Sequence, residues 1–304
     1  MPDLVSNSYF PAIAAVALDC FRKEGLDIRQ EVIFPSSKTF EALRDGDVDF
    51  VAGPAHALLP VFPEWRGVKL LAALAQGMPW LLVMRSDLEA TPGDVNAVKG
   101  RRIGAAPMVD LALKQLLVDA GIDLEADGVK FVEVPGARDP GASFGVAAAK
   151  ALEVGALDGF WANAMGAENA VRSGAGQIIL DVRRGLGPAS AVHYTMSVLA
   201  TSDRVIGADP ELAASGLRAV LAAQQALRAD IGLATLVGRE LFPPAEAELI
   251  GAIIARDLPY YTPEISDEAL SGMIRFAKMR GLLKGTPARE QIIAEGFSHL
   301  WEWQ

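Results

Sequence analysis

The sequence predicts an α/β protein of two similar lobes followed by an all-helical C-terminal region. Three observations support this fold class: short apolar runs alternate with helical patterns over about the first 200 residues, one helix–turn–strand segment recurs later in the chain, and the helical period dominates beyond Asp209. Alternating strands and helices are typical of βαβ units and a mainly parallel sheet. The chain has 304 residues, which is the length of about two domains.

The first lobe combines four short apolar runs with two helical patterns. Residues Pro11–Lys23 have helical periodicity, and Gly25 ends this helix in the manner of a C′ glycine. A second helix is expected over Thr39–Arg44, closed by Gly46. The expected strands of this lobe are Asp3–Val5, Glu31–Phe34, Asp49–Ala52 and Val68–Ala75.

The second lobe is expected to start after a hinge near Gly77–Trp80. Pro107 stands where the N1 proline of a helix belongs. Tyr194–Ala200 is a strand-like run that returns the chain to the first lobe. The expected strands of the second lobe are Trp80–Met84, Arg101–Ala105, Phe131–Val134, Gly159–Trp161 and Ile178–Asp181.

These elements predict the domain boundaries. Lobe 1 comprises residues 1–79 plus 194–304, lobe 2 comprises residues 80–193, the hinges lie near 76–84 and 186–196, and a ligand cleft lies between the lobes. The tail from Asp209 to Trp303 is helical and has an apolar face, so we expect it to pack on lobe 1.

Two internal echoes relate the lobes. Ala42–Phe50 reads A-L-x-x-G-x-x-D-F, and Ala151–Phe160 repeats this pattern with one insertion. Glu24–Ile28 is likewise echoed by Ala120–Leu124. In the first pair a helix ends at glycine and a short turn leads into a buried strand. Any α/β protein can reuse such turns, so the echoes favour two similar lobes but leave the simpler reading open.

With the run F-R-K-E-G-L-D at Phe21–Asp27 and V-K-G-R-R-I-G at Val98–Gly104, these segments resemble the type II periplasmic-binding-protein fold. They are most similar to the ABC-transporter substrate-binding group for sulfonates, nitrate and thiamine-pyrimidine precursors. The resemblance covers about residues 3–200, and its motifs specify fold more than ligand. It implies two lobes that close on a small-molecule ligand by hinge motion, an ABC permease as partner, and no cofactor.

Ligands of such folds bind where strands end and helices begin, because helix N-termini offer free N–H groups. In lobe 1 the loops at these places carry Asn7, Ser8, Tyr9, Ser36, Ser37, Lys38 and His56. Two serines beside Lys38 at a helix N-terminus form a candidate anion site, although these residues also suit a helix cap with a solvated lysine. His56 is either a donor to a carboxylate or sulfonate or a structural histidine.

In lobe 2 the corresponding loops and the hinge carry Trp80, Met108, Asp110, Trp161 and Asn163. In the family, small hydroxyl residues usually stand where Met108 and Val109 stand, and Asp110 can satisfy the helix dipole itself. This departure disfavours simple oxyanion binding. It favours a ligand with an apolar or aromatic body, or one that bears an amine. Trp80 and Trp161 are candidates for stacking on that body, the alternative being core packing.

Composition excludes several classes of function. The net charge of −10 argues against nucleic acid or an anionic membrane as main partner. Cys20 is the single cysteine and the three histidines lie far apart, so neither a disulfide nor a metal site is predicted. No apolar run approaches the roughly 18 residues of a membrane span, so no membrane insertion is expected. Gly141–Gly145 matches G-x-S-x-G without the strand that a nucleophile elbow needs, and no catalytic residue is assigned.

Three functions follow from these patterns. The favoured one is a solute-binding protein that captures a small organic ligand (a carboxylate, sulfonate or nitrogen heterocycle) for ABC-type uptake. The second is a cytoplasmic decarboxylase, dehydratase or hydrolase of a small aromatic or heterocyclic acid, which would use His56, Asp110 or His193. The third is a cytoplasmic ligand sensor. No leader peptide is visible, so the protein is cytoplasmic if the sequence is complete, and periplasmic or extracellular if a leader was removed.

Overall fold

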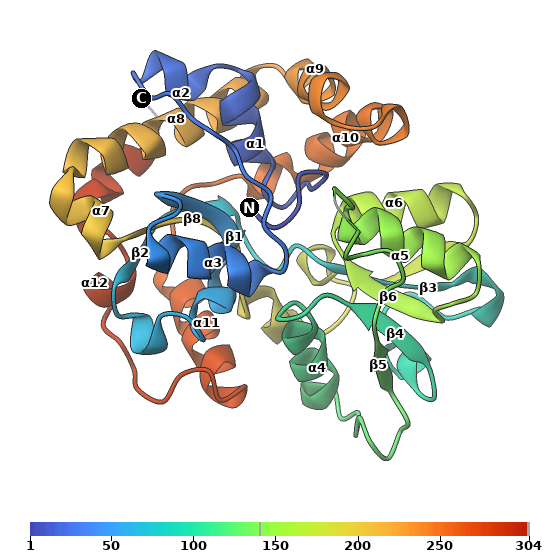
Figure 1. Ribbon diagram of the computed structural model, residues 1–304. Coiled ribbons are helices and arrows are strands. Elements are labelled where there is room, and N and C mark those ends of the chain that lie inside the picture. The colour runs from blue at the N-terminus through green and yellow to red at the C-terminus, as the bar shows by residue number, and fades with distance from the viewer. Residues whose placement is uncertain (140, 303–304) are drawn as a thin grey trace.

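The computed structural model describes residues 1–139 and 141–302 and contains two β-sheets. Each sheet lies in one of two lobes (Figure 1). Lobe 1 holds three strands in the order β1 (Phe50–Pro54), β8 (Ser197–Ser202) and β2 (Val68–Ala75). Lobe 2 holds five strands in the order β5 (Lys130–Val132), β4 (Arg102–Ala105), β6 (Gly159–Ala162), β3 (Leu81–Arg85) and β7 (Gly176–Leu180). The two-lobed α/β class predicted from the sequence is confirmed.

The sheets mix parallel and antiparallel pairs. In lobe 2, β4 pairs in parallel with both β5 and β6, whereas β3 runs antiparallel to β6 and β7. In lobe 1, β8 lies between β1 and β2 and runs antiparallel to both, with Phe50 opposite Thr201. The predicted mainly parallel arrangement is therefore wrong for lobe 1. The reason is that the chain re-enters this lobe through β8 after crossing back from lobe 2.

The helices follow the same two-lobe division. Lobe 1 contains α1 (Phe10–Ala17), α2 (Cys20–Lys23) and α3 (Ser36–Asp45), and lobe 2 contains α4 (Asp110–Asp119), α5 (Phe144–Glu153) and α6 (Ala164–Arg172). The C-terminal region contains α7 (Asp203–Ala208), α8 (Pro210–Ala229), α9 (Gly232–Leu241), α10 (Pro244–Asp257), α11 (Asp267–Met279) and α12 (Arg289–Ile292). The chain passes between the sheets twice, from β2 to β3 and from β7 to β8. The hinge segments and exact lobe boundaries stay a prediction.

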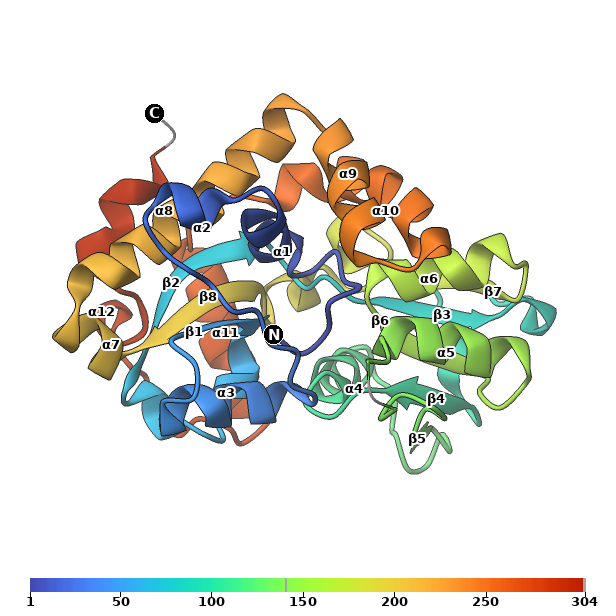
Figure 2. The same cartoon turned by 45° about the horizontal axis from the view of Figure 1, so that its top comes forward.

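The C-terminal helices cover lobe 1 and also reach lobe 2. Helix α8 packs on α1 and α2, as the apolar face of the tail predicts. Helix α10 packs on α9 and also on α6, so it bridges from the tail to lobe 2 (Figure 2). At the end of α10, the buried Asp257 accepts hydrogen bonds from Asn7 in lobe 1 and from Arg183, just after β7. The tail therefore joins the lobes in addition to covering the first of them.

Three local predictions are wrong. The helix expected over Pro11–Lys23 is broken at Asp19, whose φ of 55° is left-handed. The segments Asp3–Val5 and Glu31–Phe34 are not strands; they are loops held by side-chain hydrogen bonds and by isolated backbone hydrogen bonds such as that from the N–H of Ile33 to the Met1 carbonyl. Helix α4 starts at Asp110 and not at Pro107, because a turn with Met108 at φ 71° intervenes.

Candidate functional site

A cavity lies between the lobes where their loops meet. Its volume is about 40 Å³, and we call it the inner cavity. It is lined by Pro2, Asp3, Ser6, Ser8, Tyr9, Phe34 and Ser36 from lobe 1 and by Trp80, Ala106, Val109, Phe144, Trp161, Ala162 and Asn163 from the crossing segment and lobe 2. Ser36 and Phe144 begin helices, Val109 and Asn163 cap helices, and Ala106 follows β4, which is where this class of fold places ligands.

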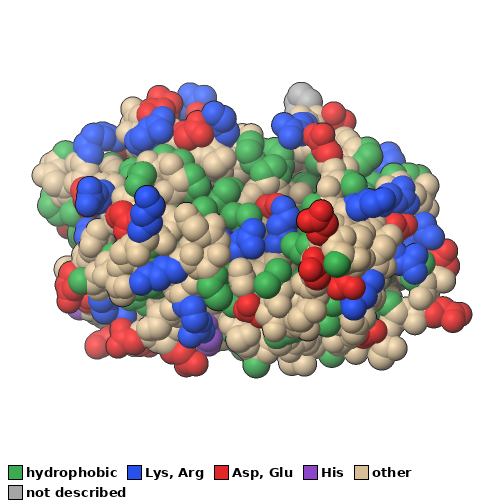
Figure 3. Space-filling model, turned by 90° about the horizontal axis from the view of Figure 1, so that it is seen from below, with side chains coloured by type: hydrophobic (Ala, Val, Ile, Leu, Met, Phe, Trp, Pro, Cys, Tyr) green, Lys and Arg blue, Asp and Glu red, His purple; other side chains and the backbone are tan. Residues whose placement is uncertain are grey.

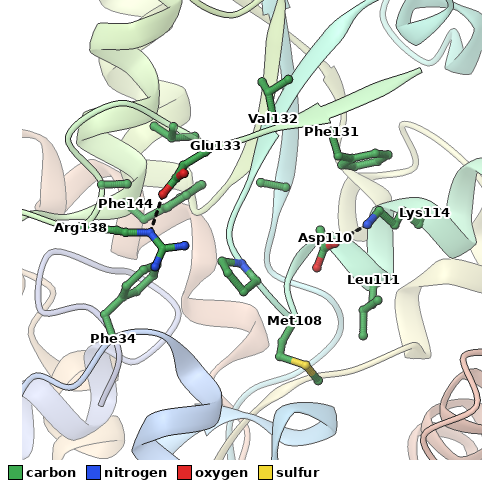
Figure 4. A pocket seen from close by; sticks show the side chains of 14 residues that line it. Phe34, Met108, Asp110, Leu111, Lys114, Phe131, Val132, Glu133, Arg138 and Phe144 are labelled. Atoms are coloured by element: carbon green, nitrogen blue, oxygen red, sulfur yellow. Dashed lines mark hydrogen bonds and ion pairs between the residues drawn. The ribbon is translucent and has the colours of Figure 1, made fainter. Parts of the chain in front are cut away.

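A larger pocket opens beside the inner cavity. This outer pocket has a volume of about 390 Å³ and lies at the start of α4 and the end of β5 (Figure 4). Both spaces are lined by Phe34 and Phe144, whose rings stack at 6.3 Å with an interplanar angle of 19°. Ligand pockets typically have volumes of roughly 300–1,000 Å³, so the outer pocket matches a small organic molecule and the inner cavity does not. The two rings separate the spaces and come from different lobes.

The outer pocket carries two ion pairs. Lys114 Nζ lies 2.5 Å from Asp110 Oδ2, and Arg138 Nε lies 2.5 Å from Glu133 Oε1 (Figure 4). Lys114 also lies 4.6 Å from the centre of the Phe131 ring. Each cation therefore already has a carboxylate partner. Over the face seen in Figure 3, acidic and basic side chains are likewise interspersed, without a field of one sign.

Two tryptophans form one wall of the inner cavity. Trp80 and Trp161 meet edge to face with ring centres 6.4 Å apart. Both are buried, and the indole Nε1 of Trp161 has no hydrogen-bond partner among the described residues. The hydroxyl of Ser8 on the opposite lobe is buried and unpartnered in the same sense. An indole N–H is only a donor, whereas a hydroxyl both donates and accepts.

Asp3 is a buried carboxylate at the same place. Its Oδ2 accepts from the hydroxyl of Ser143 at 2.9 Å and from the amide of Asn163 at 3.5 Å, and its Oδ1 accepts from the N–H of Val5 at 2.9 Å. Burial raises the pKa of Asp3 to about 7, although these hydrogen bonds act to lower it. Ser143 and Asn163 stand at the N-caps of α5 and α6, so the contacts cross from one lobe to the other.

His56 forms a second interlobe contact, close to the cavity and behind Trp80. Its Nε2 lies 2.8 Å from the Met108 carbonyl and its Nδ1 lies 2.9 Å from the Thr195 hydroxyl. Burial lowers the pKa of His56 to about 4, so the ring is neutral near pH 7. A carbonyl can only accept, so we assign the proton to Nε2, and Nδ1 accepts from Thr195. His56 thus links the two lobes and lies 6.0 Å from the Trp80 ring.

The structure brings most of the predicted site residues together. Ser8, Tyr9, Ser36, Trp80, Trp161 and Asn163 line the inner cavity, and Met108 and Asp110 line the outer pocket. Asn7 lies behind the cavity, where its amide donates to Asp257 and accepts from the N–H of Ala164 at 3.0 Å. Ser37 and Lys38 line neither space; Lys38 is exposed and pairs with Glu41 at 2.6 Å. Their ligand-binding role stays a prediction for all twelve residues.

Sequence reasoning missed three residues of the site. Asp3 was assigned to a strand, although a carboxylate two residues before a polar loop is a candidate for a loop cap. Phe34 precedes Pro35, and a residue before proline is disfavoured in a helix, so it marks a loop that the strand assignment overlooked. Phe144 lies inside the G-A-S-F-G motif, whose serine points to a nucleophile elbow, and the motif does not mark its aromatic residue as part of a site.

Residues 1–139 and 141–302 contain neither a candidate metal site nor a candidate membrane span. This range contains no group of three or more histidine, cysteine, aspartate or glutamate side chains placed to hold a metal ion. Within the same range, no helix is both long and apolar enough to cross a bilayer. Cys20 is buried in α2, and burial raises the pKa of its thiol, which disfavours a nucleophilic thiolate.

Solved structures share this architecture at low sequence identity. A protein from Bordetella bronchiseptica RB50 superposes with a TM-score of 0.78 at 18% identity, covering 99% of this chain and 94% of that chain. The alkanesulfonate-binding protein SsuA from Xanthomonas axonopodis pv. citri, bound to MOPS, has a TM-score of 0.68 at 15% identity and coverages of 94% and 95%. The desulfurization enzyme DSZB has a TM-score of 0.65 at 16% identity and coverages of 96% and 95%. A binding protein and an enzyme share the fold, so the likeness shows architecture and not activity.

Family comparison gives the remaining result. No curated protein matches this sequence. Residues 6–230 match the family model described as NMT1/THI5 like, which is well over half of the chain. The matched range includes both sheets, the inner cavity from Ser6 onward and the outer pocket. The chain therefore belongs to the NMT1/THI5-like family, and it has the two-lobed fold of the periplasmic binding proteins.

Proposed function

We propose that this protein is a solute-binding protein that captures a small organic ligand between its lobes and delivers it to an ABC-type permease. One observation carries the proposal: Ser8 from lobe 1 and Trp161 from lobe 2 line the same cavity, and the Ser8 hydroxyl and the Trp161 indole N–H are buried without a partner among the described residues. The solute-binding protein of the same fold, SsuA, and the family resemblance support the transport role.

The energetics favour a ligand at this place. A buried polar group without a hydrogen bond costs about 1–3 kcal/mol, and two residues that line the inner cavity carry such a group. A ligand with an acceptor atom, such as a carbonyl or a ring nitrogen, would satisfy the Trp161 N–H. The edge-to-face tryptophans and the Phe34–Phe144 pair provide apolar surfaces for a flat ligand body. We therefore assign the ligand to flat, acceptor-bearing organic molecules, with nitrogen heterocycles as the leading class.

Binding requires the lobes to part, because the inner cavity is too small for an organic molecule. The ligand would enter through the outer pocket and displace the Phe34–Phe144 contact. Hinges near 76–84 and 186–196 would carry this motion, since the chain crosses between the sheets in these segments. Closure then covers the ligand from both lobes, and no chemical step is needed.

Catalysis on this fold is less favoured for this chain. His56 is the histidine nearest the cavity, and both of its ring nitrogens are engaged, with Met108 and Thr195. A general base needs a free ring nitrogen within reach of its substrate. The low pKa of His56, which burial sets at about 4, also makes it a weak base near pH 7.

A thermal-shift screen tests the proposal. Purified protein is mixed with paired neutral, cationic and anionic aromatic compounds, purines, pyrimidines and nitrate, and a ligand of the folded state raises the melting temperature. Recovery of the compound unchanged supports binding, whereas recovery of an altered compound would show an enzyme. No shift with any compound, together with no association with an ABC permease, would refute the proposal.

Two variants locate the site. Ser8→Ala and Trp161→Phe should each weaken binding about tenfold, because each removes one hydrogen bond to the ligand. Ser215→Ala in α8 and Trp301→Phe, whose indole donates to the Leu71 carbonyl, are the matched controls far from the cavity. Equal affinities in all four variants would move the ligand away from the inner cavity.

A further inference from the structure

The N-terminal ends of α5 and α6 lie against each other in lobe 2. A Cβ atom added at Gly166 would lie 2.5 Å from the carbonyl oxygen of Gly145, and one at Gly145 would lie 2.6 Å from Asn163 Oδ1. Only glycine at these two positions permits such close packing. The free N–H groups and positive dipole ends of two helices therefore face the same place.

The N-terminal segment of lobe 1 reaches this place and supplies the acceptors (Figures 1 and 2). The Asp3 carboxylate accepts from Ser143, Asn163 and the N–H of Val5, and the backbone of Phe144 also hydrogen-bonds to it. Ser143 is the N-cap of α5, yet its hydroxyl makes no cap of its own helix. Next to it, the amide oxygen of Asn7 accepts from the N–H of Ala164, the first residue of α6.

Four donors around Asp3 match the roughly four acceptor positions of a carboxylate. A helix N-terminus with a serine hydroxyl and an asparagine amide is a set of donors suited to an oxyanion. In this chain that oxyanion is the protein's own side chain, held at 8% exposure. The carboxylate thus occupies a built anion site and engages the serine hydroxyl, the asparagine amide and the backbone N–H groups that surround it.

We infer that Asp3 acts as an internal anion that fills the oxyanion subsite of lobe 2, so that the protein selects uncharged ligands over sulfonates, carboxylates and nitrate. This inference rests on the proposed ligand site for its consequence but not for its geometry. Burial raises the pKa of Asp3 to about 7, so above this pH a second anion beside Asp3 would meet a like charge in a buried cavity. The two groups without a partner among the described residues, the Ser8 hydroxyl and the Trp161 indole N–H, are uncharged, so they supply no positive charge to offset that of a second anion.

The first experiment removes the carboxylate and asks whether a free anion replaces it. Asp3→Ala is melted at pH 8 with increasing formate or nitrate, at ionic strength kept constant with chloride. We expect its melting temperature to be lower than that of the unaltered protein and to rise saturably with formate. The unaltered protein and Asp45→Ala, which removes an exposed aspartate, should show no such rise. Equal responses in all three proteins would overturn the inference.

The second experiment measures ligand choice with a matched pair, benzoate and benzamide. The unaltered protein should prefer the amide, and Asp3→Ala should shift the affinity ratio toward benzoate at least tenfold. Asp3→Asn keeps the volume without the charge, so it should bind formate more weakly than Asp3→Ala and covers the case in which the alanine variant does not fold. An unaltered protein that binds benzoate as tightly as benzamide would refute the inference.

The two proposals fail differently. If the unaltered protein binds neither benzoate nor benzamide, the ligand class under the proposed function is wrong, and the formate response of Asp3→Ala still decides the anion subsite. If a sulfonate or nitrate binds the unaltered protein tightly, the proposed solute-binding function is supported and the proposed role of Asp3 is refuted.

Discussion

The Nε2 atom of His56 lies 2.8 Å from the carbonyl oxygen of Met108, and this contact joins the two lobes beside the ligand cavity. The carbonyl is presented by a left-handed backbone, since Met108 has a φ of 71°. Such a conformation is uncommon for a residue with a side chain and persists only where its surroundings hold it. His56 and Met108 therefore form a specific contact between the two lobes.

Removing the His56–Met108 contact should weaken the association of the two lobes. In His56→Ala the Met108 carbonyl and the Thr195 hydroxyl lose a buried partner, and we expect a loss of about 1–3 kcal/mol in the free energy of unfolding. The loss is measured by urea denaturation, and a larger radius of gyration in X-ray scattering would report opening of the lobes. His299→Ala removes an exposed histidine and is the control. A stability equal to that control would show that the contact contributes little.

Two buried groups should give the stability opposite dependences on pH. Burial lowers the pKa of His56 to about 4, whereas an unfolded histidine has a pKa of about 6.5. As the pH falls from 6.5 to 4, the unfolded chain therefore binds a proton at His56 before the folded chain does. His56 thus lowers the free energy of unfolding by about 3 kcal/mol over this range. Burial raises the pKa of Asp3 to about 7, so the folded chain takes up that proton first, and Asp3 adds about 4 kcal/mol between pH 7 and 4.

Single variants separate these two contributions. Asp3→Asn should lose stability steeply on acidification from pH 6.5 to 4, because only the His56 contribution remains. His56→Gln should gain stability over the same range, because only the Asp3 contribution remains. Urea denaturation at several pH values provides the measurement. If the free energy of unfolding changes with pH in the same way in both variants and in the unaltered protein, the pKa shifts of Asp3 and His56 are contradicted.

The Phe34–Phe144 pair should control ligand entry. Phe34→Ala removes one ring of the stack between the outer pocket and the inner cavity, so we expect association and dissociation rates to rise together about tenfold. Stopped-flow tryptophan fluorescence with a ligand from the thermal screen measures both rates. Phe131→Ala is the control, because Phe131 lines the outer pocket without taking part in the stack. Rates that change equally in both variants would contradict a gate at Phe34.

The close packing of α5 on α6 should tolerate no added methyl group. Gly166→Ala places a Cβ 2.5 Å from the Gly145 carbonyl oxygen, and relief requires a backbone shift that costs about 1–3 kcal/mol. Gly207→Ala in α7 is the control, because a Cβ there meets no atom within 4 Å among the described residues, and it should be neutral or slightly stabilising. Thermal denaturation that gives equal melting temperatures for both would refute the close packing.

Much of the fold could be predicted from local patterns. Gly25 and Gly46 both have positive φ, as helix-ending glycines do, and the apolar run Val68–Ala75 forms the predicted buried strand. The predicted strand at Asp3–Val5 is wrong, because its apolar pattern also suits a loop between two lobes. The predicted parallel pairing in lobe 1 is also wrong, because the direction of β8 depends on how the chain returns from lobe 2.

The sequence indicates which residues lie near the cavity, but it does not indicate which atoms their side chains contact. Ser8, Trp80 and Trp161 line one cavity, although Ser8 follows no strand, Trp80 precedes β3 and Trp161 lies within β6; their ligand-binding role stays a prediction. The same reasoning included Lys38, which points to solvent, because a sequence does not show which way an exposed side chain turns.

The sequence alone therefore determined the α/β class, the two lobes and the helical tail, since these depend on periodicity and on glycine at helix ends. Only the tertiary structure decided that Asp3 lies on the N-terminal end of α5 and that His56 contacts Met108. These partners are 140 and 52 residues apart in the chain. Contacts across such separations are set by how the two lobes close, and no local pattern records that geometry.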